Sequence, residues 1–262
     1  MDYNICMQLG DKVSMAIYLK DEFTAQYITD SSIKITLEDT DFKPIVKSDC
    51  YVFTRLNNKM YNVIIKSDIY LMEKFSVNME ELPSNKSIFI TLKPSPLYPF
   101  PKKSNIIRLS LVDSRGKAIE GTSIEAAIVS DRSAVARIVS TEGENDILNL
   151  VNISGCIERG DTFVIKKKDE DFTETNTTCT IEGKIKNGKF KLTKPLVNDQ
   201  VRGALLMPLI YTRTDSRGEC VIFFRSFREK SCEVSLKIEN EDTKRCIVME
   251  EGKPVFLKLI TA

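Results

Sequence analysis

The chain has 262 residues, with 38 lysines and arginines against 37 aspartates and glutamates, and it contains neither histidine nor tryptophan. Histidine is the usual proton shuttle at neutral pH and the commonest metal ligand, so its absence excludes Ser-His-Asp and Cys-His catalysis and most zinc sites. A net charge of +1 gives no electrostatic reason to expect nucleic acid or an anionic membrane as a partner.

The sequence also lacks the signals of a membrane or secreted protein. No stretch approaches the about 18 apolar residues that a membrane helix needs, and the first residues lack the basic and apolar regions of a signal peptide. We therefore expect a cytoplasmic product, or one that is incorporated into a particle assembled in the cytoplasm.

Alternation of apolar and polar residues with period two runs through most of the chain. Ile33, Ile35 and Leu37, for example, alternate with Lys34 and Thr36. This pattern is typical of half-buried strands in antiparallel sheets, and short strands at this spacing predict an all-β fold of sandwiches. The predicted strands are 13–19, 33–38, 50–54, 61–65, 87–92, 106–112, 122–129, 162–166, 177–181, 189–192, 219–225, 233–239 and 254–260.

A proline-rich stretch divides the chain. Four of the nine prolines fall within residues 94–101, and because proline fixes φ and cannot donate to a β-ladder, an extended segment outside any central strand is expected. We predict an N-terminal β-sandwich over 1–93 and a stiff linker over 94–104. Leu97, Tyr98 and Phe100 would pin this linker between two domains, although a proline-recognising partner could instead bind it.

Two similar motifs follow the linker. Asp113 and Gly116 have the identities that a four-residue turn prefers at its ends, and Asp215 and Gly218 repeat them ahead of another apolar strand. The pair Asp-x-x-Gly-x-x-Ile-x-Gly and Thr-Asp-x-x-Gly-x-x-x-Phe resembles the transthyretin-like, immunoglobulin-like β-sandwich of carboxypeptidase regulatory-like domains. A fainter echo over 49–53 lacks the glycine. The resemblance implies two such sandwiches.

The two motifs are separated by more residues than is usual in that family, which predicts an insertion. We place the second sandwich at 105–144 and 209–262, and a small β-barrel-like module at 145–208. The strand after Gly160 and the later Leu192-Thr193-Lys194-Pro195-Leu196 run are similar to small β modules that recur in phage-tail and surface proteins.

No motif for catalysis, a cofactor or a metal is recognised. The acidic clusters lie at predicted turns, where solvated charge is expected. Asp169, Asp171 and Glu174 offer oxygen atoms at a spacing that calcium could use, but the glycine and terminal glutamate of an EF-hand are missing and a lysine run lies beside them. The seven cysteines include no Cys-x-x-Cys pair, and we interpret them as buried thiols.

Aromatic residues near the C-terminal end offer one possible binding face. Phe223, Phe224 and Phe227 alternate with Arg225 and Arg228, so this strand could stack bases or sugars, or it could be a core strand with two flanking arginines. The absence of tryptophan argues against the sugar interpretation.

The leading hypothesis is a non-enzymatic structural or adaptor protein that makes protein–protein contacts. The order of a β domain, a Leu-Tyr-Pro-Phe-Pro linker and a regulatory-like domain resembles bacterial proteins associated with phage-tail-like contractile particles, which implies tail-like subunits as partners. The alternative is an adhesin-like module that binds a carbohydrate or another surface ligand. The sequence does not indicate the oligomeric state.

Overall fold

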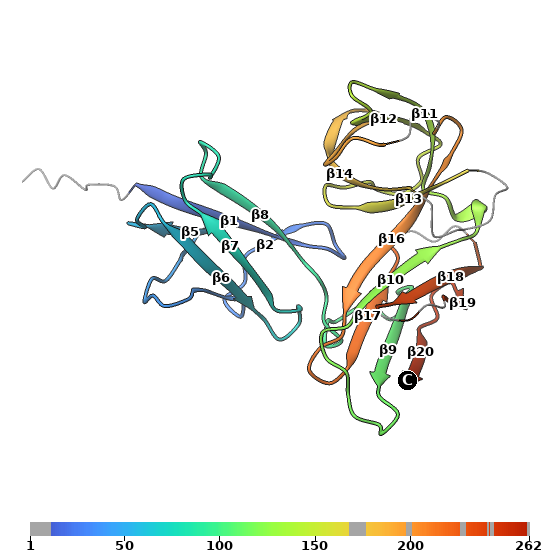
Figure 1. Cartoon of the computed structure of the whole chain (residues 1–262), viewed down its shortest axis with the longest axis horizontal. Coiled ribbons are helices and arrows are strands. Elements are labelled where there is room, and N and C mark those ends of the chain that lie inside the picture. Colours follow the sequence, from blue (N-terminus) through green and yellow to red (C-terminus); the bar gives the residue numbers. More distant parts are fainter. Residues whose placement is uncertain are drawn as a thin grey trace, which may run out of the picture. The chain divides into compact units, whose positions relative to one another are not determined.

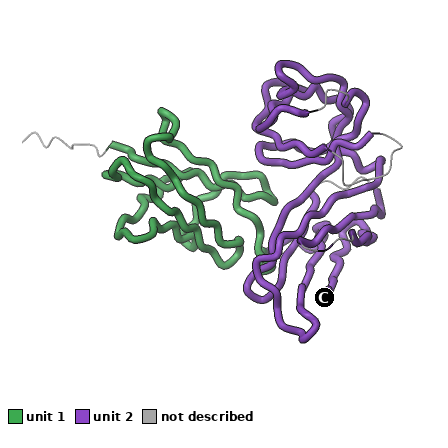
Figure 2. The backbone as a smooth tube through the Cα atoms, in the orientation of Figure 1, with its two compact units in different colours: residues 1–98 green, residues 99–262 purple. Residues whose placement is uncertain are grey.

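The computed structural model describes residues 12–167, 177–197, 201–225, 229–239, 241 and 244–260. The chain divides into two compact units, residues 1–98 and 99–262 (Figure 2). Within the described ranges every regular element is a β-strand except one short 3₁₀ turn, η1 (Asp131–Ser133). The all-β prediction is therefore confirmed.

Unit 1 is built from two sheets (Figure 1). Alternate residues of β1, among them Met15, Ile17 and Leu19, are buried, and so are Ile35 and Leu37 of the other sheet, so that one face of each sheet forms the sandwich core. The larger sheet contains β2 (Tyr27–Ile28), β1 (Val13–Asp21), β5 (Tyr51–Thr54) and β4 (Ile45–Val46), with β8 (Ser87–Leu92) also paired to β1; the smaller contains β3 (Lys34–Leu37), β6 (Met60–Lys66) and β7 (Glu73–Asn78).

Unit 2 contains a second sandwich. Its core joins Ile107, Leu109 and Leu111 of one sheet to residues such as Ala126 and Leu236 of the other. The three-stranded sheet is β17 (Glu219–Phe223), β9 (Ile106–Val112) and β20 (Val255–Ile260); the facing strands are β16 (Leu205–Arg213), β10 (Ser123–Ile128), β18 (Ser231–Ile238) and β19 (Arg245–Glu250).

The inserted module of unit 2 is a closed barrel. Its strands follow the order β11-β12-β15-β14-β13-β16, and β11 pairs back to β16, which closes the ring. A separate apolar core fills it, from Val135 to Leu206. The remaining strands are β11 (Ala136–Glu142), β12 (Ile147–Val151), β13 (Thr162–Lys166), β14 (Thr177–Lys186) and β15 (Lys189–Leu192). The barrel-like character of the insert is confirmed, while its boundaries at 145 and 208 stay predictions.

One strand belongs to both parts of unit 2. The first half of β16 pairs with β13, and its second half, from Leu209 to Arg213, pairs with β10. Figure 1 shows it running from the barrel into the sandwich. The barrel is thus attached through continuous backbone pairing rather than through a loose connection.

The prediction of antiparallel sheets is wrong for two pairs of strands. β8 runs parallel to β1, and β20 runs parallel to β9. In each unit the last strand therefore pairs with the first, and we call β8 and β20 the closing strands. Alternation of apolar residues reports which face is buried but not the direction of the neighbouring strand, which is why the sequence did not distinguish the two arrangements.

The proline-rich stretch contains turns, which the extended segment predicted from its composition does not include. Pro94 forms a β-bridge with Tyr70. Two turns follow: the amide of Tyr98 donates to Ser95 O at 3.0 Å, and the amide of Ser104 donates to Pro101 O at 3.0 Å. The first turn has Pro96 at its second position, where a fixed φ of about −65° is favoured.

Candidate contact site

The outward face of the larger sheet in unit 1 carries a group of three aromatic rings, which we call the aromatic face. Tyr18 on β1 lies directly beside Phe89 on β8, its register partner, and the two rings stack with centroids 5.0 Å apart. Tyr27 on β2 meets both rings at 6.3 and 6.1 Å. Tyr27 is 51% exposed and Phe89 41% exposed, so the rings are available for contact with another molecule.

The sheet beneath the aromatic face is apolar on both sides. Ala16, Cys50 and Val52 form a buried cluster against which Tyr18 packs, while the alternate residues of β1 point into the sandwich core. The sequence contains a signal for this arrangement, because residues 15–19 are an uninterrupted apolar run, and such a run indicates a strand whose two faces are both apolar. The prediction of contact residues did not use this run, because apolar and polar residues alternate in most other strands.

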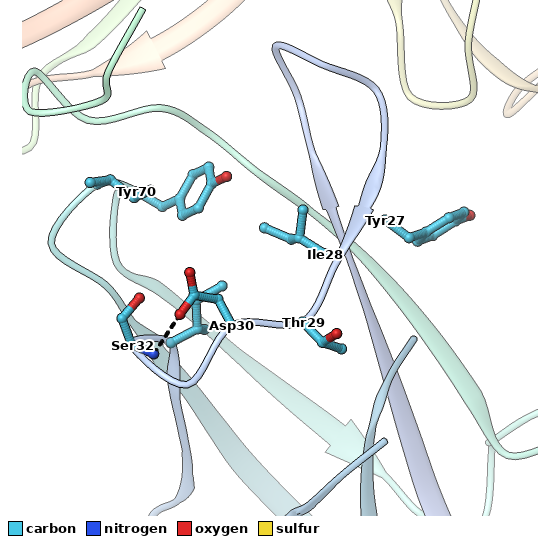
Figure 3. Close-up of a pocket in the computed structure, with 8 residues that line it drawn as sticks. Tyr27, Ile28, Thr29, Asp30, Ser32 and Tyr70 are labelled. Atoms are coloured by element: carbon cyan, nitrogen blue, oxygen red, sulfur yellow. Dashed lines mark hydrogen bonds between the residues drawn. The ribbon is translucent and has the colours of Figure 1, made fainter. Parts of the chain in front are cut away.

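A cavity of about 330 Å³ lies on the other side of β2 (Figure 3). Ile28, Tyr70 and Tyr27 are among the residues that line it, and Figure 3 shows the ring of Tyr27 turned away from Ile28 and Tyr70. Asp30 Oδ1 accepts the amide N–H of Ser32 at 2.8 Å, and this bond holds the pKa of Asp30 below its usual range. The hydroxyl of Tyr51 donates to the carbonyl oxygen of Asp30 at 2.8 Å and accepts the amide N–H of Asp30 at 2.9 Å. These polar groups have structural partners and do not form a catalytic arrangement.

A buried carboxylate anchors the proline-rich stretch. Asp21 is 3% exposed. Its Oδ2 accepts the hydroxyls of Tyr70 at 2.7 Å and Tyr98 at 2.5 Å, and its Oδ1 accepts the amides of Phe23 and Thr24 at 2.7 and 3.0 Å. Burial, followed by the adjacent Asp21 carboxylate, raises the pKa of both phenols well above the ordinary value. Tyr98 therefore holds the chain against unit 1.

The other predicted contact residues lie in different settings. Leu97 is 60% exposed at the turn after Pro96, and Phe100 packs against Phe223 with ring centroids 6.0 Å apart. Phe224 is 3% exposed within the core of unit 2, which confirms the core-strand interpretation and corrects the alternative of a stacking face there. Arg225 forms an ion pair with Asp161. Phe227 and Arg228 lie outside the described residues.

The two Asp-x-x-Gly motifs adopt the same turn. The amide of Gly116 donates to Asp113 O and that of Gly218 to Asp215 O, each at 2.9 Å. The side chain of each aspartate also accepts two amides of its own turn, at 2.8 to 3.0 Å. Gly218 has a positive φ, and a Cβ there would lie 2.4 Å from Leu111 O. The motifs are therefore structural.

Thr214, which precedes the second motif, joins the two turn regions. Its hydroxyl donates to Ile119 O at 2.7 Å and accepts the amide of Thr122 at 3.0 Å. The residue is 2% exposed. One buried hydroxyl therefore satisfies both a donor and an acceptor of the segment before β10. The threonine of the Thr-Asp-x-x-Gly motif thus connects two neighbouring loops by hydrogen bonds and has a structural role.

Ion pairs tie the barrel to the sandwich. Arg225, after β17, contacts Asp161, before β13, at 2.9 Å. Lys166, at the end of β13, is 7% exposed and contacts Asp131 of η1 at 2.5 Å. Both pairs are largely shielded from water, so each partner would be left as a poorly solvated charge if the other were removed.

A second cavity of about 380 Å³ has Val129, Glu229 and Glu233 in its lining, and the carbonyl of Val129 accepts from Lys166. The Glu229 carboxylate accepts the hydroxyls of Ser130 at 2.5 Å and Ser133 at 3.0 Å. One oxygen, Oε2, thus joins η1 to the loop before β18. No nucleophile paired with a base emerges from these contacts.

The part of the chain that the structure describes contains neither a metal-binding cluster nor a cysteine placed as a reactive nucleophile. No group of three or more acidic or cysteine side chains there could hold a metal ion, and the calcium candidates Asp169, Asp171 and Glu174 lie outside it. Four cysteines are buried, and burial raises the pKa of Cys179 and of Cys220 to about 12. Thiols with raised pKa values are poor nucleophiles.

Comparisons with known proteins return only distant structural likenesses. No protein-family model matches the chain, and no curated protein matches it. A streptococcal ancillary pilin matches over 95% of this chain and 99% of its own, with 11% identity and a TM-score of 0.21. Shaft pilin spaA from Lactobacillus rhamnosus GG, solved in two forms, covers 95% of this chain and 98% of its own, with 9% identity and a TM-score of 0.25.

These solved structures are pilins, not phage-tail proteins. Their TM-scores are too low to carry an argument about function, and the fold assignment rests on the strands and sheets described above. The specific carboxypeptidase regulatory-like family stays a prediction from the sequence motifs. No helix in the described residues is long and apolar enough to cross a membrane.

Proposed function

We propose that this chain is a non-enzymatic structural or adaptor protein that binds other proteins through the outer surfaces of its β-sandwiches. The observation that carries the proposal is the aromatic face, where Tyr27 and Phe89 are 51% and 41% exposed on a paired sheet. Rigid, half-exposed aromatic side chains bury a large area at small cost in conformational entropy, which makes them frequent anchors of protein interfaces.

The finer part of the proposal is that the partners are subunits of a phage-tail-like particle, assembled in the cytoplasm. It rests on the order of the sequence segments and on the resemblance of the barrel insert to modules of phage-tail proteins. The test is sedimentation of purified tail-like particles with the purified chain. We expect the wild-type chain to pellet with the particles and Tyr27→Ser/Phe89→Ser to stay in the supernatant.

A matched control keeps this test informative. Met60→Ser changes another exposed apolar residue, 63% exposed and on the other sheet of unit 1, and should pellet like the wild type. A wild-type chain that never pellets with the particles would contradict the tail-particle partner, while equal loss in the control would contradict the role of the aromatic face.

The aromatic face also supports a second candidate, an adhesin-like module that binds carbohydrate. Sugar rings stack on exposed aromatic side chains, and hydroxyl-bearing neighbours could hydrogen-bond to them; Thr91 lies across β1 from Tyr27, each paired in register with Lys20. Binding to a glycan array that is lost in Tyr27→Ser but kept in Met60→Ser would favour this candidate. An array without any signal would exclude it for the glycans displayed.

A further inference from the structure

The closing strand of unit 2 presents an open, apolar edge. Among the described strands β20 pairs only with β9, so its other edge exposes backbone N–H and C=O groups that no neighbouring strand uses. Phe256 is 71% exposed and Ile260 61% exposed. An exposed apolar edge of this kind is a template for pairing with another strand.

Two side chains on this strand have no ring or ion-pair partner among the residues that the structure describes. Phe256 makes no ring contact and Lys258 no ion pair among the described residues. By contrast, Phe89 on the equivalent closing strand of unit 1 stacks on Tyr18. The sequences of the two strands are similar, Ile-Phe-Ile-Thr-Leu over 88–92 and Val-Phe-Leu-Lys-Leu over 255–259, so the difference lies in what covers the phenylalanine.

We propose that β20 pairs antiparallel with β20 of a second copy of this chain, forming a two-fold symmetric dimer with one continuous six-stranded sheet. The proposal deepens the proposed contact function, on which it rests, by naming one partner. A two-fold axis makes the interface self-complementary. Each contact between one residue of the first copy and another residue of the second copy is repeated with the two copies exchanged.

The pattern of the strand selects one register. Directly opposite residues of an antiparallel pair share a face, so the outward Phe256 and Lys258 must oppose outward residues. Placing Leu257 on the two-fold axis sets Phe256 against Lys258 of the second copy, and Val255 against Leu259, on the partly buried face. A shift of two residues in one direction would set Lys258 against Lys258, and in the other direction would leave it facing Pro254.

In the selected register, Phe256 and Lys258 each gain a partner in the second copy. A lysine ammonium over an aromatic face is attracted by the ring, and the dimer contains two such pairs. A lysine on an edge strand ordinarily hinders pairing, but here the second copy supplies a ring rather than another charge. The inward residues extend the core-facing side of the sheet, where Val255, Leu257 and Leu259 already pack against the unit 2 core.

The test is analytical ultracentrifugation of the full chain from about 1 to 200 µM, because association follows mass action. We expect a reversible dimer in the wild type. Lys258→Glu should weaken association about tenfold, since it removes both cation–ring pairs. Phe256→Lys/Lys258→Glu should restore it, because an introduced carboxylate then faces an introduced ammonium twice. Val248→Thr, on the exposed edge strand β19, is the control and should dimerise like the wild type.

Each other result has a defined meaning. A wild-type chain that stays monomeric throughout, or a double variant no better than Lys258→Glu, overturns the dimer. Equal loss in Val248→Thr overturns the choice of β20. Circular dichroism should show unchanged folding, since the altered side chains are exposed. Sedimentation of Lys258→Glu with tail-like particles separates the two proposals: a variant that is monomeric and still pellets leaves the contact function standing.

Discussion

At the scale of single residues, the carboxylate of Asp21 is buried and accepts hydrogen bonds from four donors within unit 1. Buried polar groups are stable only when such partners are present. The two tyrosine donors come from residues 49 and 77 positions away, and one of them, Tyr98, ends the first turn of the proline-rich stretch. A polar pair at this separation leaves no periodic signal in a sequence.

The first prediction concerns alkaline pH. Because the pKa values of Tyr70 and Tyr98 are raised in the folded state, the fold keeps both protons at pH values where the unfolded chain, with tyrosine pKa near about 10, has lost them. Stability is complete below about pH 10 and falls above it, by up to about 1.4 kcal/mol per pH unit for each phenol.

Urea unfolding followed by circular dichroism at about pH 8 and about pH 10.5 measures this loss. In Tyr70→Phe/Tyr98→Phe the decline should be clearly smaller, while Tyr27→Phe should behave as the wild type. A decline of the same size in the double variant would show that other groups cause it.

The second prediction concerns Gly218. Its φ of +72° and the 2.4 Å approach of a Cβ to Leu111 O leave alanine no room, so Gly218→Ala should lower the free energy of unfolding by about 3 kcal/mol. Gly116 has a similar φ but nothing within 4 Å, so Gly116→Ala should cost only about 1 kcal/mol. Urea unfolding compares them, and equal costs would contradict the steric explanation.

At the scale of elements, β16 organises unit 2. It closes the barrel through β11 and β13 and then continues beside β10 in the sandwich. The ion pair between Arg225 and Asp161 crosses the same junction. Side chains and backbone pairing therefore fix the barrel to the sandwich together.

The third prediction tests this ion pair. Arg225→Met should destabilise the protein by about 1 to 2 kcal/mol, because the largely buried carboxylate of Asp161 then loses the charge of Arg225. Arg217→Met removes a cation whose partners Asp215 and Glu219 are local and whose side chain is 52% exposed, so its cost should be within about 0.5 kcal/mol. Thermal unfolding by calorimetry gives both values; a larger effect at Arg217 would refute the argument.

At the scale of the whole molecule, both units share one strand arrangement, in which the last strand pairs in parallel with the first. This arrangement brings the ends of each unit's chain segment into one sheet. Among the described strands it also leaves β8 and β20 each with one unpaired edge, so the surface available for contacts follows from the way each unit is closed.

The fourth prediction counts thiols as a test of both cores. Cys156 and Cys246 are exposed, whereas Cys50, Cys179, Cys220 and Cys232 are buried. In a Cys6→Ser background, which removes the cysteine outside the described residues, an aromatic disulfide reagent should modify two thiols in the native protein at about pH 8. Cys156 should react more slowly than Cys246, because its hydrogen bond to Glu158 raises the pKa of its thiol. The other four should react only after denaturant is added. Rapid reaction of a third thiol in the native protein would contradict the packing described here.

Much of the fold could be predicted from local patterns. The strands β3 and β18 follow the alternation of their apolar residues, and both Asp-x-x-Gly motifs form the predicted turns. The candidate site could not be predicted in the same way. Tyr98 and Phe224 were predicted contact residues and are buried. Tyr18, Tyr27 and Phe89 form one aromatic face because β8, which is distant in sequence, pairs beside β1, while β2 follows β1 directly.

The sequence by itself determined the all-β class, the turns and the absence of histidine chemistry, because side-chain alternation, turn residues and composition act over a few positions. Only the tertiary structure decided that the closing strands run parallel, that β16 joins barrel to sandwich, and which aromatic rings meet water. These features depend on pairing between segments many tens of residues apart, and the energy of such pairing lies in the register of whole strands rather than in any local pattern.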